Sequence, residues 1–392
     1  MAQRKISAVY MRGGTSKGVF FKTDALPADP VLRDAILLRV IGSPDPYGKH
    51  TDGMGGATSS TSKVVLVGRS SREDCDVDYL FGAVSIDAPV IDWSGNCGNL
   101  TSAVGPFAIE QGLANAPRDG VATVRIWQAN IGAKIVAHVP MKDGAVVEEG
   151  DFELDGVTFP AAEIRIEFLD PGGDTRGDGT DTMFPTGNVT DSVDVPGYGT
   201  YRLTLINAGN PAIFVSAEDL GLRGNEMQDD VNNDAALLAK CEAIRAHAAV
   251  HMGLAQTPDE VTQKRPHTPK LAFVSLPHAY TAASGKRILP SMVNINARIL
   301  SMGRLHHAMT GTGAVAIAVA AAIPGTVVNA LLGSRRAPQI RFGHPSGVMV
   351  VGAETSQRAD KWIVTKVLMS RSARRLMEGT VFIPSDADAG SA

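Results

Sequence analysis

Lys63 and Cys97 are the residues of this sequence that are best suited to proton transfer. Lys63 stands directly before the apolar run at residues 64–67 and follows a loop at residues 53–62 that consists almost entirely of small side chains. A lysine that is drawn into an apolar strand can lose its proton near neutral pH and act as a general base. We therefore interpret Lys63 as a candidate catalytic residue rather than as a lysine whose head group reaches solvent.

Cys97 is the second candidate catalytic residue and lies in a turn of glycine and amide residues, SGNCGN, at residues 94–99. A thiol at the start of a helix has a lowered pKa and can act as a nucleophile or as an acid and base. No histidine lies close to it in the sequence, which disfavours the acyl-enzyme chemistry of thiol hydrolases. Cys241 differs, because it stands among apolar residues at helical spacing and is expected in the core.

Two similar turns, residues 96–104 (NCGNLTSAV) and 309–317 (MTGTGAVAI), each run from small polar and glycine residues into an alanine-rich apolar segment. Free backbone N–H groups at the start of a helix bind anions, so two such starts that face each other would hold a dicarboxylate. The turn residues that we expect to bind substrate are Asn96, Gly98, Asn99, Thr310, Gly311 and Thr312. The distance of half a chain between the turns suggests a duplicated domain.

A further turn, MRGGTSKG at residues 11–18, offers a guanidinium group, hydroxyl groups and backbone donors between two predicted strands. Arg12 is suited to bind a substrate carboxylate through two parallel hydrogen bonds. Thr15 and Ser16 add hydroxyl donors to the same expected binding site. The turn lacks the closing Gly-Lys-Ser/Thr triplet of a nucleotide-binding Walker A loop.

No cofactor and no metal is expected from the remaining motifs. Residues 311–316 match one form of the dinucleotide fingerprint, but no clear strand precedes them and no acidic residue follows between Gly313 and Gly352. The nine histidines show no metal-binding spacing, since His306 and His307 are adjacent. The three cysteines are too few and too widely spaced for an iron–sulfur cluster, and their odd number favours a reducing compartment over a disulfide framework.

The elements that must position these residues follow from the pattern of apolar residues. Short runs rich in β-branched residues predict strands at residues 63–67, 121–127, 134–139, 200–206, 213–216 and 271–276. A helix is expected at residues 30–41, between an Asp29 cap and Gly42, and a second one at residues 233–252. The predicted fold class is therefore α/β.

Length and composition indicate a soluble protein of two domains. The chain has 392 residues, of which 44% are hydrophobic and 20% are charged, and its formal net charge is −4. This length exceeds that of one ordinary core, and the negative charge disfavours a nucleic-acid partner. The apolar run at residues 314–323 is too short to cross a membrane. Breaker-rich segments at residues 170–182 and 194–200 predict domains at residues 1–198 and 199–392, with a terminal segment that can cross back.

Several of these segments resemble the PrpF family of 2-methylaconitate isomerases, whose relatives include the 4-oxalomesaconate tautomerases. The motifs that carry the resemblance lie at residues 11–18, 41–46, 52–56, 94–99, 309–313 and 369–374, nearly from end to end. The resemblance implies the diaminopimelate epimerase fold, with two pseudo-symmetric domains that each wrap a curved sheet around a central helix. Both central helices of the epimerases begin with a catalytic cysteine, whereas this sequence has Cys97 and Thr310. The threonine argues against racemisation by two thiols, because a hydroxyl is a far weaker acid than a thiol.

The resemblance also implies roles for single residues. In the PrpF family the residue that matches Lys63 is regarded as the principal acid and base, and the cysteine that matches Cys97 lies near it. Asn210 is similar to an asparagine of the epimerases that contacts substrate. Arg298 and Ser346 are weaker candidates for carboxylate contacts.

The implied function is cofactor-independent isomerisation of an unsaturated tricarboxylate in the cytoplasm, by allylic proton transfer through Lys63. The leading substrate is 2-methylaconitate, in the methylcitrate cycle of propionate catabolism. The alternatives are a 4-oxalomesaconate tautomerase of aromatic acid catabolism, an aconitate isomerase, or a non-catalytic accessory protein of an iron–sulfur methylcitrate dehydratase. Besides the tricarboxylate, the expected partners are that dehydratase and further copies of the chain, but neither nucleic acid nor a membrane.

Overall fold

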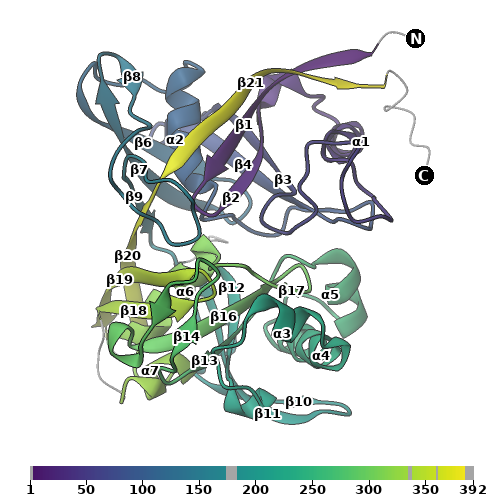
Figure 1. Ribbon diagram of the computed structural model, residues 1–392, viewed down its shortest axis with the longest axis vertical. Coiled ribbons are helices and arrows are strands. Elements are labelled where there is room, and N and C mark those ends of the chain that lie inside the picture. The colour runs from purple at the N-terminus through teal and green to yellow at the C-terminus, as the bar shows by residue number, and fades with distance from the viewer. Residues whose placement is uncertain (1–2, 174–182, 334–337, 359–360, 385–392) are drawn as a thin grey trace.

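The computed structural model describes residues 3–173, 183–333, 338–358 and 361–384, which form two halves, one above the other in Figure 1. The upper half contains the helices α1 (Pro30–Ile41) and α2 (Thr101–Glu110). Its strands are β1 (Arg4–Gly13), β2 (Ser16–Lys22), β3 (Lys63–Arg69), β4 (Val77–Val84), β5 (Ile91–Asp92), β6 (Gly120–Gln128), β7 (Ala133–Lys142), β8 (Ala145–Val146) and β9 (Ile164–Leu169).

The lower half contains the helices α3 (Gln228–Asn232), α4 (Ala235–His251), α5 (Pro258–Lys264), α6 (Gly311–Ala322) and α7 (Val327–Leu331). Its strands are β10 (Asp191–Val195), β11 (Gly199–Ala208), β12 (Asn210–Ser216), β13 (Lys270–Ser275), β14 (Tyr280–Thr281), β15 (Arg287–Ile288), β16 (Ile295–Ser301), β17 (Arg304–Leu305), β18 (Gln339–His344) and β19 (Gly347–Arg358). The chain ends with β20 (Lys361–Arg371) and β21 (Ala373–Ile383).

The last two strands connect the halves. β20 pairs with β19 of the lower half and with β9 of the upper half. β21 then runs along the upper half in Figure 1 and pairs with β1, from Ile383 opposite Arg4 to Ala373 opposite Gly13. The boundary between residues 198 and 199 stays a prediction, and residues 174–182 of the breaker-rich segment lie outside the described residues.

The predicted elements are present. All six predicted strands fall within or overlap β3, β6, β7, β11, β12 and β13. The Asp29 side chain caps α1 by accepting hydrogen bonds from Val31 N at 2.8 Å and Leu32 N at 3.2 Å. Gly42 ends this helix with a φ of 86°, a conformation that glycine adopts without strain. The helix predicted at residues 233–252 is α4, which begins at Ala235.

Each half is built around one central helix, which confirms the predicted epimerase-like architecture. All 12 residues of α6 are buried, and the helix packs against β11, β12, β18, β19 and β20. Eight of the 10 residues of α2 are buried, and it packs against β1, β6, β7, β9 and β21. A helix that is apolar on all sides belongs in the interior. In the described part of the chain, no helix combines the length and the apolar character that a membrane crossing requires.

The structure confirms the prediction that Cys241 is a core residue. It is 1% exposed on the inner face of α4 and belongs to an apolar cluster with side chains such as Leu237 and Ile244. Burial raises the pKa of its thiol to about 12, so the group stays neutral and unreactive.

The starts of the two central helices meet between the halves. A Cβ atom added to Gly311 would lie 2.4 Å from the carbonyl carbon of Gly98, and one added to Gly98 would lie 2.8 Å from that of Gly311. No side chain fits between two backbones at this distance, which explains the glycine at both positions. The contact places the positive ends of two helix dipoles in one small volume.

Gly311→Ala should therefore destabilise the protein. The added methyl group would meet backbone atoms, which can move aside only if a central helix shifts, and overpacking of this kind costs about 1–3 kcal/mol. Thermal unfolding followed by circular dichroism measures the effect. Gly379→Ala in β21 is the matched control, because no atom lies within 4 Å of a Cβ added there. Equal melting temperatures for the two variants would contradict the prediction.

Candidate active site

Lys63 begins β3, as predicted, and the residue is only 4% exposed. Its Nζ lies 4.9 Å from the centre of the Phe81 ring on the neighbouring strand β4. Within the described structure, no hydrogen bond or ion pair uses this amine. A contact with one ring replaces only part of the hydration that a buried ammonium loses, so Lys63 is available for a further partner.

Cys97 lies in the turn before α2 and is 7% exposed. The helix begins at Thr101, so the thiol precedes the first helical residue by four positions. The Cys97 carbonyl accepts hydrogen bonds from the backbone N–H and the hydroxyl of Thr101, both at 3.0 Å, and from the Tyr79 hydroxyl at 3.4 Å. Burial raises the pKa of Tyr79, with a contribution from Cys97, so the phenol remains a neutral donor.

Both helix starts present free backbone donors. The Thr310 hydroxyl accepts a hydrogen bond from Gly313 N at 3.1 Å and so caps α6. Among the hydrogen bonds between described residues, none uses the backbone N–H groups of the following residues: Gly98, Asn99, Gly311 and Thr312. Four free N–H groups at two helix starts suit an anionic ligand, as expected from the two similar turns.

Asn210 joins the turn of Cys97 to the lower half. Its Oδ1 accepts a hydrogen bond from Asn96 N at 2.7 Å, and its Nδ2 donates to Asn96 O at 2.9 Å and to Thr312 Oγ1 at 3.2 Å. The Asn210 amide is thus occupied by protein groups. In contrast, Asn96 Nδ2 is buried and has no partner among the described residues. An unpaired buried donor is costly, so Asn96 is the better placed of the two amides for a ligand.

Asn99 is fixed from both halves. Its Nδ2 donates to Thr15 Oγ1 at 2.9 Å and to Met309 O at 3.2 Å, while its Oδ1 accepts from Arg371 Nε at 3.2 Å. Arg371 is 1% exposed, and burial lowers its pKa to about 9. Sequence reasoning missed Arg371, whose only signal was its place in the motif at residues 369–374.

Arg12 and Ser16 lie beside Thr15 on the hairpin of β1 and β2. Arg12 Nη1 donates to Gly14 O at 3.1 Å, to Ser372 O at 3.0 Å and to Ser372 Oγ at 3.1 Å, so this nitrogen holds the hairpin. Burial lowers the pKa of Arg12. Ser16 is buried, and its hydroxyl forms no hydrogen bond with another described residue. Contact of either residue with a substrate carboxylate stays a prediction.

Arg298 and Ser346 are also engaged with protein groups. Arg298 is fully buried on β16, its Nη1 donates to two backbone carbonyls, and its guanidinium lies 4.8 Å from the centre of the Tyr280 ring. Its Nη2 is buried without a partner in the described part of the chain. The Ser346 hydroxyl donates to His307 O at 2.6 Å. Their role as carboxylate contacts stays a prediction.

A cavity of about 1500 Å³ is open between the halves. Its wall includes Arg12, Thr15 and Ser16 of the upper half, and His306 and His307 of the lower half. Lys63 and Cys97 are not part of this wall, although the charge of Lys63 acts on both histidines. The two predicted catalytic residues are thus buried and do not line this cavity.

The imidazole groups around Lys63 are neutral. Burial is the main cause of the lowered pKa values of His267, His306 and His307, and the charge of Lys63 contributes to each. The rings of His306 and His307 stack with their centroids 4.7 Å apart. A neutral imidazole can donate a hydrogen bond to a carboxylate. Sequence reasoning weighed this pair only as metal ligands, and the described residues contain no group of three potential metal-binding side chains.

Lys270 is a second buried lysine, and sequence reasoning missed it. It begins β13, is 3% exposed, and its Nζ donates to His267 O and Ser301 Oγ, both at 3.1 Å. Burial, followed by the charge of Lys63, lowers the pKa of Lys270 to about 7. A lysine at the start of a strand commonly extends its head group to water, so nothing in the local sequence indicates this burial.

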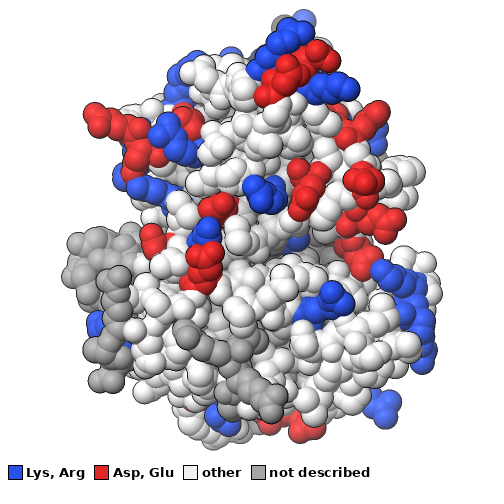
Figure 2. Space-filling model, turned by 90° about the vertical axis from the view of Figure 1, so that its left-hand side faces the viewer, with Lys and Arg blue, Asp and Glu red and all other residues white. Residues whose placement is uncertain are grey.

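Buried positive charge is the common feature of this region. Four side chains that are at most 4% exposed form no ion pair with a described carboxylate, namely Lys63, Lys270, Arg298 and Arg371. On the face shown in Figure 2, basic and acidic side chains are interspersed and much of the surface is uncharged. The formal net charge of the whole chain is −4, so the excess of positive charge is internal and local. Such a site favours a ligand with several negative charges.

Comparison with known proteins agrees with this chemistry. The chain matches the family described as PrpF protein over residues 3–384. It is 60% identical over 389 residues to a 2-methyl-aconitate isomerase of Shewanella oneidensis, with 97% of this chain and 98% of that protein covered. It is 37% identical to a 4-oxalomesaconate tautomerase of Pseudomonas putida, with 98% of each protein covered.

Solved structures support the same fold. The crystal structure of a methylitaconate-delta-isomerase is 38% identical and covers 100% of this chain and 99% of its own, with a TM-score of 0.75. A hydroxyproline epimerase of Agrobacterium vitis is 13% identical and covers 99% of this chain and 95% of its own, with a TM-score of 0.56. The second likeness concerns the fold alone and agrees with the predicted architecture.

Lys270 should make the stability of the protein rise with pH. Its pKa is 10.5 in an unperturbed chain and about 7 in the fold, so between these values the unfolded chain binds more protons and stability increases with pH. Each unit of the difference is worth about 1.4 kcal/mol. Urea unfolding of the wild type and of Lys270→Met from about pH 7 to about pH 10 measures this contribution. The wild type should gain stability relative to the variant, and a constant difference would contradict the prediction.

Proposed function

We infer that this chain, which belongs to the PrpF protein family, is an isomerase of unsaturated tricarboxylates that acts on 2-methylaconitate without a cofactor. The 60% identity to a 2-methyl-aconitate isomerase over nearly the whole chain supports this substrate. The observation that carries the chemistry is the Lys63 amine, which is buried over Phe81 and has no hydrogen-bond or ion-pair partner among the described residues. A free amine in a dry, anion-binding site is suited to remove a proton from carbon.

In the proposed reaction, the amine of Lys63 acts as the base and removes an allylic proton that the conjugated carboxylates make acidic. The electron pair of the broken C–H bond is then shared over a dienolate. The former double bond has single-bond character in this intermediate, so its substituents can rotate. The ammonium of Lys63 finally returns a proton to the allyl system. The product therefore contains the same atoms as the substrate.

The helix starts supply the stabilisation that this intermediate requires. The free N–H groups of Gly98, Asn99, Gly311 and Thr312 would bind the carboxylates and the oxygen that gains negative charge. Cys97 precedes the first two of these groups in the same turn. We propose its thiol as the second catalytic group.

We place the reaction in the methylcitrate cycle of propionate catabolism and in the cytoplasm. The three cysteines are free and buried, which suits a reducing compartment. An iron–sulfur methylcitrate dehydratase is a proposed partner, since loss of water from methylcitrate yields a methylaconitate. Association with further copies of the chain is proposed as well.

The alternative substrate is 4-oxalomesaconate, supported by the tautomerase that is 37% identical to this chain. The higher identity to the 2-methyl-aconitate isomerase favours the first proposal. Isomerisation of aconitate, a further alternative, would require the same chemistry on a substrate that lacks the methyl group. A non-catalytic accessory protein would have no need of a buried lysine without a partner, because such a group lowers stability.

Lys63→Met should lower kcat/KM for 2-methylaconitate by at least about a hundredfold, the low end of what a general base contributes. The assay follows conversion of trans-2-methylaconitate by NMR in D₂O, which also reports deuterium in the product. Lys240→Met is the matched control, because Lys240 Nζ also lies over an aromatic ring, 5.8 Å from the centre of Tyr201, but Lys240 is not part of the cavity wall.

If Lys63→Met turns over substrate at the rate of the Lys240→Met control, Lys63 is not the catalytic base. Parallel assays with 4-oxalomesaconate and trans-aconitate decide between the substrates, since the physiological acid should show the highest kcat/KM. If the wild type converts none of the three acids but copurifies with a methylcitrate dehydratase, the accessory-protein alternative replaces the proposed one.

A further inference from the structure

Lys270 and His267 form a buried pair in the lower half that reaches the turn of Cys97. Lys270 Nζ lies 3.3 Å from His267 Nδ1, and His267 Nε2 lies 3.3 Å from Asn96 O. An ammonium group can only donate, so in that form of Lys270 the Nδ1 atom accepts and the ring proton sits on Nε2. His267 then donates this proton to the carbonyl of the residue directly before Cys97. Lys270 thus selects the tautomer that holds the turn.

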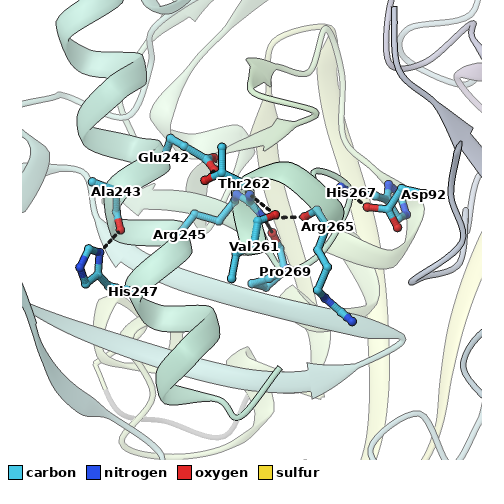
Figure 3. Close-up of polar contacts among 10 residues, drawn as sticks. All are labelled: Asp92, Glu242, Ala243, Arg245, His247, Val261, Thr262, Arg265, His267 and Pro269. Carbon is cyan, nitrogen blue, oxygen red and sulfur yellow. Dashed lines mark hydrogen bonds and ion pairs between the residues drawn. The ribbon is translucent and has the colours of Figure 1, made fainter. Parts of the chain in front are cut away.

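The loop that carries this pair is held in place. Figure 3 shows Arg245 of α4 beside the carbonyls of Arg265 and Pro269, and Arg245 Nη1 donates to them at 2.9 Å and 3.4 Å. The same figure shows His267 beside Asp92, whose Oδ2 accepts from His267 N at 2.7 Å. The backbone before β13 is therefore anchored to α4 on one side and to the upper half on the other, so the imidazole has a defined position.

The imidazole of His267 also contacts the ring beneath Lys63. The centroids of the His267 and Phe81 rings are 5.3 Å apart, and Lys63 Nζ lies 4.9 Å from the centre of the same Phe81 ring. A displacement of His267 would therefore reach both proposed catalytic residues, Cys97 through the Asn96 carbonyl and Lys63 through Phe81.

The charge of Lys270 depends on groups from several elements. Burial is the main cause of its lowered pKa of about 7, and Lys63 of β3 and Arg245 of α4 lower it further. Cys97, before α2, and Asp92 of β5 raise it. Burial is the main cause of the lowered pKa values of His267 and His306, the charge of Lys270 adds to it, and these imidazoles stay neutral. Near neutral pH, Lys270 therefore exchanges between an ammonium and an amine.

We propose that Lys270 is a positioning residue of the isomerase, which holds the turn of Cys97 and the Phe81 ring beneath Lys63 through His267 and strengthens the binding of substrate carboxylates in its ammonium form. This inference rests on the proposed function. A buried lysine without a carboxylate partner destabilises the fold, and an apolar side chain could fill its place, so packing alone does not account for it. The contacts of the Lys270 amine with His267 and Ser301 provide a reason for a lysine at this buried position.

Two variants separate the effect of Lys270 on the position of His267 from the effect of its positive charge. Lys270→Gln keeps a donor for His267 Nδ1 but has no charge, whereas Lys270→Met has neither. Lys240→Met is the control for removal of a lysine from the same half, since Lys240 Nζ donates only to Leu220 O at 3.3 Å among the described residues. The measurements are kcat and KM for 2-methylaconitate from about pH 6 to about pH 9, with melting temperatures for all variants.

We expect Lys270→Gln to retain most of kcat but to raise KM at least about tenfold at the acidic end, where the wild type carries the ammonium. The ratio of kcat/KM between wild type and Lys270→Gln should fall towards one as the pH rises through about 7, because the wild type then loses the charge that the variant lacks. Lys270→Met should lower kcat as well. Nitrogen NMR of histidine-labelled protein, assigned with His267→Gln, should show a protonated Nε2 in the wild type and a mixture of tautomers in Lys270→Met.

A pH-independent ratio between wild type and Lys270→Gln, together with an unchanged His267 tautomer in Lys270→Met, would overturn the proposal. So would loss of thermal stability in both variants with unchanged kinetic constants. If the wild type converts none of the acids, the proposed function fails by itself. Calorimetric binding of tricarballylate, a saturated tricarboxylate, then tests Lys270, because its affinity for the wild type should weaken above about pH 7 while that for Lys270→Gln stays constant.

Discussion

The structure depends on one electrostatic constraint, which is positive charge that is buried between two halves and forms no ion pair with a described carboxylate. Lys63, Lys270 and Arg371 lie close to two helix starts whose backbone donors are free. Each buried ion loses hydration at a cost of several kcal/mol, and the helix dipoles add to the positive potential. A tricarboxylate is a ligand that can balance all of these groups at once. The buried positive charge that lowers the stability of the free protein thus also favours the binding of a polyanion.

The duplicated fold explains how so many donors come together. Each half wraps a sheet around one central helix, and glycine at positions 98 and 311 lets the two helix starts touch. Thr310, at the position of the second thiol of the epimerases, uses its hydroxyl to cap α6. In the proposed mechanism, proton transfer is therefore assigned to a residue from the sheet, Lys63 at the head of β3. The same scaffold can thus serve allylic isomerisation rather than inversion at a stereocentre.

The sequence predicted those parts of the site that depend on local structure. The strand start at Lys63 and the helix start within the turn of residues 309–317 follow from neighbouring residues, and both were confirmed. Lys270 and Arg371 escaped prediction because their burial is set by strands from distant parts of the chain. The sequence also did not indicate the contacts of Arg12, where one guanidinium nitrogen donates to the carbonyls of Gly14 and Ser372, while its contact with a substrate carboxylate stays a prediction. The availability of an atom, unlike its chemical type, depends on tertiary contacts.

The turn of Cys97 belongs to the upper half by sequence but is held by the lower one. Asn210 hydrogen-bonds to both backbone polar atoms of Asn96, and His267 hydrogen-bonds to Asp92. A hydroxyl contact of 2.6 Å between Ser94 and Thr268 adds a third link. Asn99 of the same turn adds a fourth link, since its Nδ2 donates to Met309 O. The position of Cys97 therefore depends on contacts that form only when the two halves are packed together, which explains why the sequence around Cys97 alone does not determine it.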